Sequence, residues 1–146
     1  CPFISADSDV FRKLSSEGAL LKAKDSTTAV IRWWNGVSGL LDFSNPIAIE
    51  WFKNQLKYLV DKYNIDGFKF DAGDAEYYKN LISYKNIPPN DHSSLFGQFG
   101  LIYPLNEYRA MWKMGGQPLA ERLRDKEHTW QDMQKLMVTP IQFWMF

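Results

Sequence analysis

The segment from Asp66 to Asp74 holds the side chain that is best placed for chemistry in this chain. It reads Asp-Gly-Phe-Lys-Phe-Asp-Ala-Gly-Asp, so Asp71 follows a short run of alternating aromatic and polar residues that predicts a strand. In α/β proteins, active-site residues lie at the carboxyl ends of strands. A carboxylate at such a position, with Lys69 two residues earlier, is a candidate nucleophile.

Two more predicted strands end in charged residues. One spans 102–108 and ends at Arg109, and the other spans 119–124 and ends at Asp125. Successive strand ends lie side by side in a parallel sheet or barrel. We therefore expect Asp71 and Asp125 to face one another across a cleft, with Arg109 between them.

Paired carboxylates are what glycoside hydrolysis requires. In retaining enzymes one carboxylate attacks the anomeric carbon and the other protonates the leaving oxygen, and the two carboxyl groups lie about 5–5.5 Å apart. In inverting enzymes the separation is about 6.5–9.5 Å. The sequence gives no distance between Asp71 and Asp125.

The elements that must position these residues alternate between helix and strand. The clearest helix begins after a cap at Ser44 or Asn45, has Pro46 in its first turn and ends near Asn64. The strand of 68–70 follows at once, which is typical of a repeating α/β unit. Five apolar residues of the helix are expected to form one buried stripe: Phe52, Leu56, Leu59, Val60 and Tyr63.

The rest of the chain is less regular. We expect a short strand at 2–5, a hairpin over 20–34 that turns at 24–26, and a final helix that begins after a cap at Thr129. The polar segment at about 75–100 is expected to be an irregular insertion between a strand and its helix, of the kind that shapes a pocket.

Composition limits the classes of function. Acidic and basic residues balance at 17 each, so electrostatics give no support for nucleic acid or an anionic membrane as a partner. The single cysteine, Cys1, excludes an internal disulfide framework, and neither histidine has a partner at metal-ligand spacing. No apolar run approaches the length of a membrane span. Apolar residues at both ends suggest a piece of a longer protein, and the cellular compartment stays open.

Aromatic residues are abundant, with 6 Trp, 7 Tyr and 10 Phe. Most are expected in the core, and a few could stack on the apolar faces of sugar rings. Trp33 and Trp34, followed by Asn35 and Gly36, form the clearest such cluster. Neighbouring residues on a strand point to opposite faces, so only one of the two tryptophans can face a pocket.

Together, these segments resemble glycoside hydrolase family 31, the family of α-glucosidases, α-xylosidases and α-galactosidases. Residues 66–74 are similar to the nucleophile segment of the family, although Asp74 stands where the family usually has Glu. Residues 124–130, Arg-Asp-Lys-Glu-His-Thr-Trp, are similar to the acid/base segment. The interval from Arg109 to Asp125 also matches that between an active-site arginine and the acid/base aspartate.

Two further features of the sequence belong to the same resemblance. Residues 33–36 followed by 41–46 are similar to the stretch that precedes the nucleophile strand of the family. The form of the segments at 68–73 and 106–109 is most like the branch that holds the myogenesis-regulating glycosidase and bacterial α-galactosidases. The resemblance covers nearly the whole chain.

The resemblance implies roles for individual residues. Asp71 would be the nucleophile and Asp125 the acid/base residue. A nearby Lys69 or Arg109 would lower the pKa of Asp71, whereas Asp125 needs dry surroundings or another carboxylate to raise its pKa. The residues that would contact the sugar or support the site are Lys69, Arg109, Trp33, Trp34 and Trp130, the last packing behind Asp125.

The resemblance also implies a fold and a function. Residues 1–146 would form the central part, about strands three to six, of a (β/α)8 TIM barrel, and the rest of the barrel would be required. The function would be retaining hydrolysis of α-linked galactosides or glucosides through a covalent glycosyl-aspartate, with no metal or cofactor. Two alternatives are a carbohydrate-binding pseudo-enzyme and an inactive fragment of the barrel.

Overall fold

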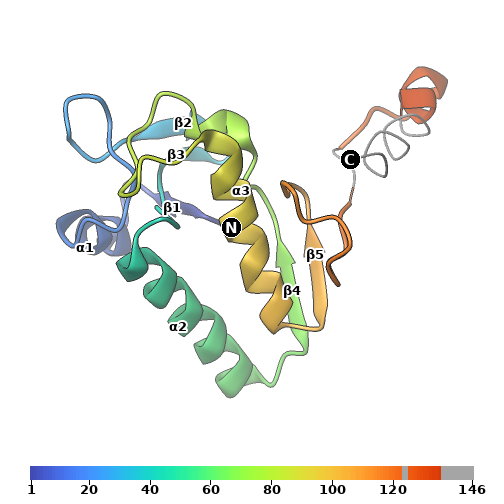
Figure 1. Cartoon of the computed structure of the whole chain (residues 1–146), viewed down its shortest axis with the longest axis horizontal. Helices are drawn as coiled ribbons and strands as arrows, with labels where there is room; N and C mark the ends of the chain where they lie inside the picture. Colours follow the sequence, from blue (N-terminus) through green and yellow to red (C-terminus); the bar gives the residue numbers. More distant parts are fainter. Residues whose placement is uncertain (123–124, 136–146) are drawn as a thin grey trace.

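The computed structural model describes residues 1–122 and 125–135 (Figure 1). Within that part, no helix combines the length and the apolar character that crossing a membrane requires. The helices and strands, with η for 3₁₀-helices, are β1 (Phe3–Ser5), α1 (Asp9–Ser16), β2 (Ile31–Trp33), β3 (Gly36–Leu40), α2 (Pro46–Tyr63), β4 (Gly67–Phe70), η1 (Ala75–Tyr78), α3 (Pro89–Gly97), η2 (Gln98–Ile102) and β5 (Leu105–Tyr108).

The strands form two separate sheets. β4 and β5 pair in parallel, with Lys69 opposite Glu107 and Phe70 opposite Tyr108. The connection between them contains α3, as a parallel pair requires a crossover. The other sheet is antiparallel, in the order β1-β3-β2. The described residues therefore contain one parallel α/β unit and no closed barrel.

The strand predicted at 119–124 is present only as a single parallel bridge. Glu121 pairs with Tyr108, whose N–H donates to the carbonyl of Ala120 at 2.8 Å. The N–H of Arg122 then donates to the carbonyl of Tyr108 at 2.8 Å. These bonds fix Arg122 beside the carboxyl end of β5, and residues 123–124 lie outside the described part.

The hairpin predicted over 20–34 forms only in part. Lys22 bridges Thr28 around the predicted turn, but β2 does not continue this pairing. Instead, β2 turns back at Trp34 and Asn35 and pairs with β3. The prediction placed the second strand of the hairpin on the wrong partner because alternation alone does not tell which neighbour a strand pairs with.

The predicted helix is confirmed as α2. The side chain of Asn45 accepts the N–H of Ile47 at 2.9 Å, and Asn64 ends the helix in a left-handed conformation with φ of 51°. Its buried residues are Ala48, Phe52 and Leu56. The predicted stripe was wrong beyond Leu56, because the last turns of the helix extend past the core and leave residues such as Tyr63 exposed.

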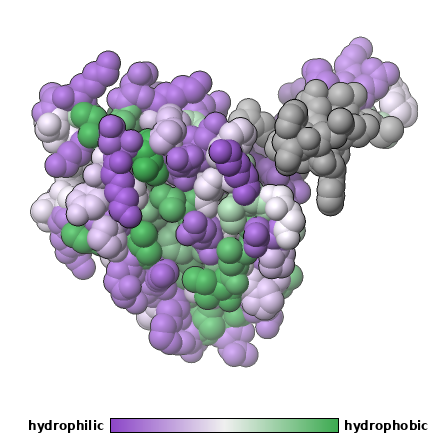
Figure 2. Space-filling model, viewed as in Figure 1, coloured by the Kyte–Doolittle hydropathy of each residue, from purple (hydrophilic) through white to green (hydrophobic). Residues whose placement is uncertain are grey.

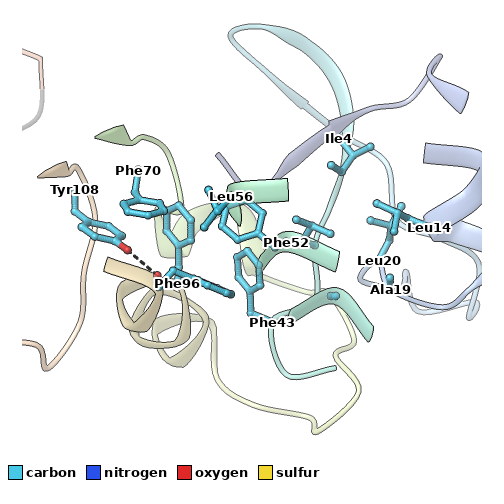
Figure 3. Packing of buried hydrophobic residues seen from close by; sticks show 13 residues of the cluster. Ile4, Leu14, Ala19, Leu20, Phe43, Phe52, Leu56, Phe70, Phe96 and Tyr108 are labelled. Carbon is cyan, nitrogen blue, oxygen red and sulfur yellow. Dashed lines mark hydrogen bonds between the residues drawn. The ribbon is translucent and has the colours of Figure 1, made fainter. Parts of the chain in front are cut away.

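Aromatic rings join α2, α3 and β4–β5 in one core (Figure 3). Phe70 stacks on Tyr108 at 4.7 Å between ring centroids, and Phe96 meets Phe70 edge-on at 5.8 Å. Phe43 and Phe52 extend the same cluster towards α2. The tyrosine hydroxyl donates to the carbonyl of Phe96 at 3.0 Å. One face of the parallel strands is therefore fully used by the core.

The segment at about 75–100 is not irregular throughout, so this expectation was wrong. It contains η1, α3 and η2, and α3 buries His92, Ser93 and Phe96. Pro89 occupies the first turn of α3, a position that proline favours. That this segment is an insertion stays a prediction.

Apolar side chains remain exposed around η2 and the start of β5. Leu101, Ile102 and Leu105 are all exposed, and Figure 2 shows the hydrophobic surface that gathers over this region. A patch of this kind is typical of a surface that contacts another segment or chain.

We expect Asn45→Ala to lower the free energy of unfolding by about 1–2 kcal/mol, because it removes the cap of α2. It also removes the bond from the Asn45 side-chain amide to the carbonyl of Gly18, at 2.8 Å. Denaturant unfolding measures the loss. Asn54→Ala on the exposed face of the same helix is the control and should change stability by less than about 0.5 kcal/mol. Equal losses in both variants would contradict the capping role.

Candidate active site

Asp71 lies directly after β4, where the chain turns sharply. The two residues that follow have left-handed backbones, with φ of 63° at Ala72 and 86° at Gly73. Such a conformation is rare for a residue other than glycine, and strain of this kind gathers at functional sites. The turn leaves the Asp71 side chain 36% exposed at the end of the strand.

Helix α3 holds this turn from behind. The Ser93 hydroxyl donates to the carbonyl of Gly73 at 2.7 Å, within the buried interior. The ring of Phe96 lies so close to Gly73 that a Cβ there would approach its Cδ1 to 2.7 Å. On the other side, Ala72 belongs to a buried cluster with Phe3. The position of Asp71 is therefore set by packing on both sides.

The face of the sheet opposite the core carries charge. Side chains alternate along a strand, and Phe68 and Phe70 both contact the aromatic core. Lys69 and Asp71 therefore lie on the other face, and Glu107 of β5 shares it because it pairs with Lys69. This face therefore carries Asp71, the predicted nucleophile.

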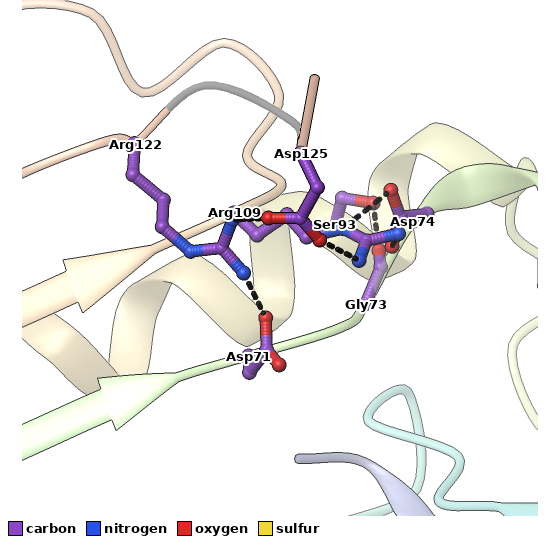
Figure 4. Close-up of polar contacts among 7 residues, drawn as sticks. All are labelled: Asp71, Gly73, Asp74, Ser93, Arg109, Arg122 and Asp125. Atoms are coloured by element: carbon purple, nitrogen blue, oxygen red, sulfur yellow. Dashed lines mark hydrogen bonds and ion pairs between the residues drawn. The ribbon is translucent and has the colours of Figure 1, made fainter. Parts of the chain in front are cut away.

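Arg122 joins Asp71 to Asp125. Its Nη2 lies 2.7 Å from Asp71 Oδ1 and its Nη1 lies 3.0 Å from Asp125 Oδ1 (Figure 4). Its Nε lies 3.1 Å from Glu107 Oε1. The structure thus brings the two predicted catalytic carboxylates within reach of one guanidinium. Sequence reasoning missed Arg122 as a site residue, and the only local signal is its place three residues before Asp125.

Arg109 occupies a different position from the one expected. Its Nη2 lies 3.2 Å from Asp74 Oδ2, and its Nη1 lies 3.8 Å from Asp125 Oδ2. The Asp74 carboxylate is almost fully buried, so this pair is well shielded from water. Arg109 therefore links the turn after β4 to Asp125, and the arginine between Asp71 and Asp125 is Arg122.

The surroundings of Asp71 lower its pKa. Partial burial acts in the opposite direction, but the Ala72 N–H, the Arg122 charge and hydrogen bond, and the more distant Lys69 charge together outweigh it. Lys69 thus contributes as expected, although less than Arg122. Asp71 is consequently ionised at neutral pH, as a nucleophile must be.

Asp125 does not have the dry surroundings that were expected. Its side chain is 82% exposed, and its contacts are with the cations of Arg109 and Arg122. The expectation followed from what an acid needs, whereas Arg122, Arg124 and Lys126, which flank Asp125 in the sequence, already pointed to basic surroundings.

The three predicted tryptophans have different surroundings. Trp33 stacks on Phe3 at 3.9 Å between ring centroids, and its Nε1–H donates to the Ser38 hydroxyl at 3.0 Å. Of the two neighbouring tryptophans, Trp33 is therefore the one that packs against other side chains of the protein. Trp34 is 74% exposed, and its ring lies edge-on to Trp33 at 5.3 Å. Trp130 is 78% exposed, so its expected packing behind Asp125 is not found. Residues 130–135 are helical, and the cap predicted for this helix is confirmed, because the Asp132 N–H donates to the Thr129 hydroxyl at 3.2 Å.

A hollow of about 430 Å³ lies elsewhere, between the loop after α1 and the start of α2. Asp42, Asn45 and Tyr84 line it, and Asp71 does not. Among residues 1–122 and 125–135, no group of three or more His, Cys, Asp or Glu side chains is arranged to hold a metal ion.

The family model described as the glycosyl hydrolases family 31 TIM-barrel domain matches residues 1–140. The chain belongs to glycoside hydrolase family 31. It is therefore part of a TIM-barrel domain, although the described residues alone do not close a barrel.

Curated relatives are much longer than this chain. The myogenesis-regulating glycosidase of Mus musculus is 30% identical over 133 residues, which cover 88% of this chain and 19% of that protein. Alpha-xylosidase XylQ of Lactiplantibacillus pentosus is 26% identical over 142 residues, which cover 97% of this chain and 17% of that protein. The chain thus spans less than a fifth of the length of these relatives.

Solved structures share the fold. A cycloalternan-degrading enzyme from Trueperella pyogenes matches 91% of this chain and 22% of its own, with a TM-score of 0.77 at 22% identity. A family 31 sulfoquinovosidase from E. rectale matches 75% of this chain and 18% of its own, with a TM-score of 0.62 at 21% identity.

We expect Gly73→Ala to destabilise the protein by about 1–3 kcal/mol more than Gly116→Ala. Both glycines have left-handed backbones, with φ of 86° and 79°, so alanine brings similar backbone strain to each. Only Gly73 has a neighbour, Phe96, that a Cβ would meet. Thermal melting of the two variants isolates this steric effect. Equal losses would show that Phe96 does not constrain the turn after Asp71.

Proposed function

We propose that this chain carries the catalytic carboxylates of a retaining α-glycoside hydrolase. Membership of a glycosidase family supports this class of enzyme, and the activity, mechanism and specificity are the proposal. The observation that supports it best is that Asp71 and Asp125 both contact Arg122, at 2.7 and 3.0 Å. Two acids within reach of one guanidinium are close enough to act on one glycosidic bond.

In the first step, Asp71 attacks the anomeric carbon of the sugar while the bond to the leaving oxygen breaks. Asp125 gives its proton to that oxygen, so the departing group leaves as a neutral alcohol. Water then attacks the glycosyl-aspartate, Asp125 takes a proton from this water, and the Asp71 carboxylate is restored. The lowered pKa of Asp71 favours its role as the nucleophile.

The substrate we propose is an α-linked glucoside or galactoside. Relatives named as α-xylosidases make α-xylosides the first competing class. Lys69 and Arg109 would donate hydrogen bonds to sugar hydroxyls, and the exposed ring of Trp34 offers a face on which a sugar can stack. Assays of the complete protein with nitrophenyl α-glucoside, α-galactoside and α-xyloside test the choice.

We propose that further segments complete the barrel, of which this chain supplies about strands three to six. The outer edge of β4 and the exposed apolar residues near β5 are surfaces that neighbouring strands and helices of a barrel would cover. On this proposal, the chain by itself is inactive.

One observation favours the alternative of a carbohydrate-binding pseudo-enzyme. Asp125 is 82% exposed and its printed contacts are with two arginines, whereas a general acid is expected in drier surroundings. A pseudo-enzyme would bind one of the three nitrophenyl glycosides without releasing nitrophenol. Release of nitrophenol by the wild-type protein, but not by Asp71→Asn, excludes it.

We expect Asp71→Asn to lower kcat by at least about 1,000-fold, because an amide cannot form the glycosyl ester. Nitrophenol release measures the rate. Asp61→Asn, which changes an exposed aspartate at the end of α2, is the control and should keep wild-type activity. Near-normal turnover by Asp71→Asn would refute the assignment of the nucleophile.

Asp125→Asn should affect substrates according to their leaving groups. With nitrophenyl glycosides, which need little protonation, the first step should persist and the glycosyl-enzyme should accumulate. With an unactivated disaccharide, kcat/KM should fall by about 100-fold or more, as expected when a general acid is lost. Equal losses for both substrates would contradict the acid/base role of Asp125.

A further inference from the structure

We propose that Arg122 is a positioning residue that serves Asp71 and Asp125 in turn, following the single negative charge that these two acids share through the reaction. This inference rests on the proposed function above. Its basis is the position of one guanidinium in contact with both carboxylates.

Arg122 is held through both its backbone and its side chain. The Arg122 backbone N–H donates to the Tyr108 carbonyl at 2.8 Å, which anchors the residue to β5. At the other end, Glu107 Oε1 lies 3.1 Å from Nε. The side chain is 24% exposed, so most of it is covered by the surrounding residues.

Each nitrogen of the fork has its own carboxylate. Nε lies against Glu107, Nη2 against Asp71 and Nη1 against Asp125. A guanidinium can do this because it is planar and its donors diverge, whereas the single ammonium of lysine cannot hold three such positions. The arrangement therefore depends on arginine in particular and not on positive charge alone.

The charge on the two acids stays constant during the proposed reaction. Before attack, Asp71 is a carboxylate and Asp125 is protonated. In the intermediate, Asp71 is a neutral ester and Asp125, which has given away its proton, is a carboxylate. Because Arg122 contacts both, it can stabilise the nucleophile in the first step and the general base in the second without moving its anchor on β5.

Glu107 offsets part of the positive charge of Arg122. Arg122 faces a third carboxylate through Nε, so the attraction of its cation for the catalytic pair is moderated. Removing this carboxylate should strengthen the hold of Arg122 on both acids.

The test compares Arg122→Gln, Arg122→Lys and the control Arg12→Gln in the complete protein. Arg12 also forms an ion pair with an aspartate, Asp9, but on the exposed surface of α1. Without the charge of Arg122, the pKa of Asp71 rises, so the acidic limb of kcat/KM should move to higher pH by about one unit in Arg122→Gln. Arg122→Lys should keep that limb near its wild-type position while kcat falls at least about tenfold, because the charge remains but the fork is lost.

A second measurement needs no turnover. Carbodiimides react with protonated carboxyl groups, so the pH dependence of modification at Asp71, followed by mass spectrometry of the peptide 70–79, reports its protonation directly. In Arg122→Gln the modification should begin about one pH unit higher than in the wild type, and Arg12→Gln should match the wild type. Thermal melting shows whether each variant is folded. If Arg122→Gln is not, Arg122→Lys carries the test through its kcat, and a kcat equal to that of the wild type would overturn the inference.

Unchanged pH limbs and unchanged modification profiles in a folded Arg122→Gln protein would overturn the inference. Failure of the proposed function has a different signature. In that case the wild-type protein would release no nitrophenol from any of the three glycosides, while the modification profile would still decide whether Arg122 controls the charge of Asp71.

Discussion

The site depends on one constraint, which is that the parallel strands β4 and β5 have two unlike faces. Phe70 and Tyr108 stack on one another and are closed in by α2 and α3, so that face is fully occupied by aromatic rings. Because side chains alternate along a strand, the opposite face must receive Lys69 and Glu107. The apolar packing therefore decides where the charges gather, before any specific contact between them forms.

At that end of the sheet, two arginines contact the carboxylates around them. Arg109 holds the buried carboxylate of Asp74, which fixes the turn after β4, and Arg122 holds Asp71 at the same end of the sheet. Asp125 contacts both arginines and comes from a separate segment of the chain. Close charge pairs at partly buried positions shift pKa values, and such groups are typical of functional sites. In this site the shift that favours catalysis is the lowered pKa of Asp71.

Local signals in the sequence were sufficient for some elements and insufficient for others. The bounds of α2 follow from Asn45, Pro46 and Asn64, because capping depends on neighbours within a few residues. The position of Asp71 at the end of β4 follows in the same way from alternation. Helix α3 was missed because its buried face is defined by rings from distant segments, although proline in its first turn was a usable signal. Arg122 was missed since its contact with Asp71 joins residues that are 51 positions apart.

The account centres on a covalent bond between a sugar and one carboxylate, and the most direct measurement is to trap that bond. The complete protein would be incubated with a mechanism-based α-glycoside inhibitor whose glycosyl-enzyme hydrolyses slowly, and then digested and sequenced by mass spectrometry. The account predicts one sugar residue attached to Asp71, and no labelling in Asp71→Asn. Labelling at a different carboxylate, or no labelling while the inhibitor is shown to bind, would contradict it.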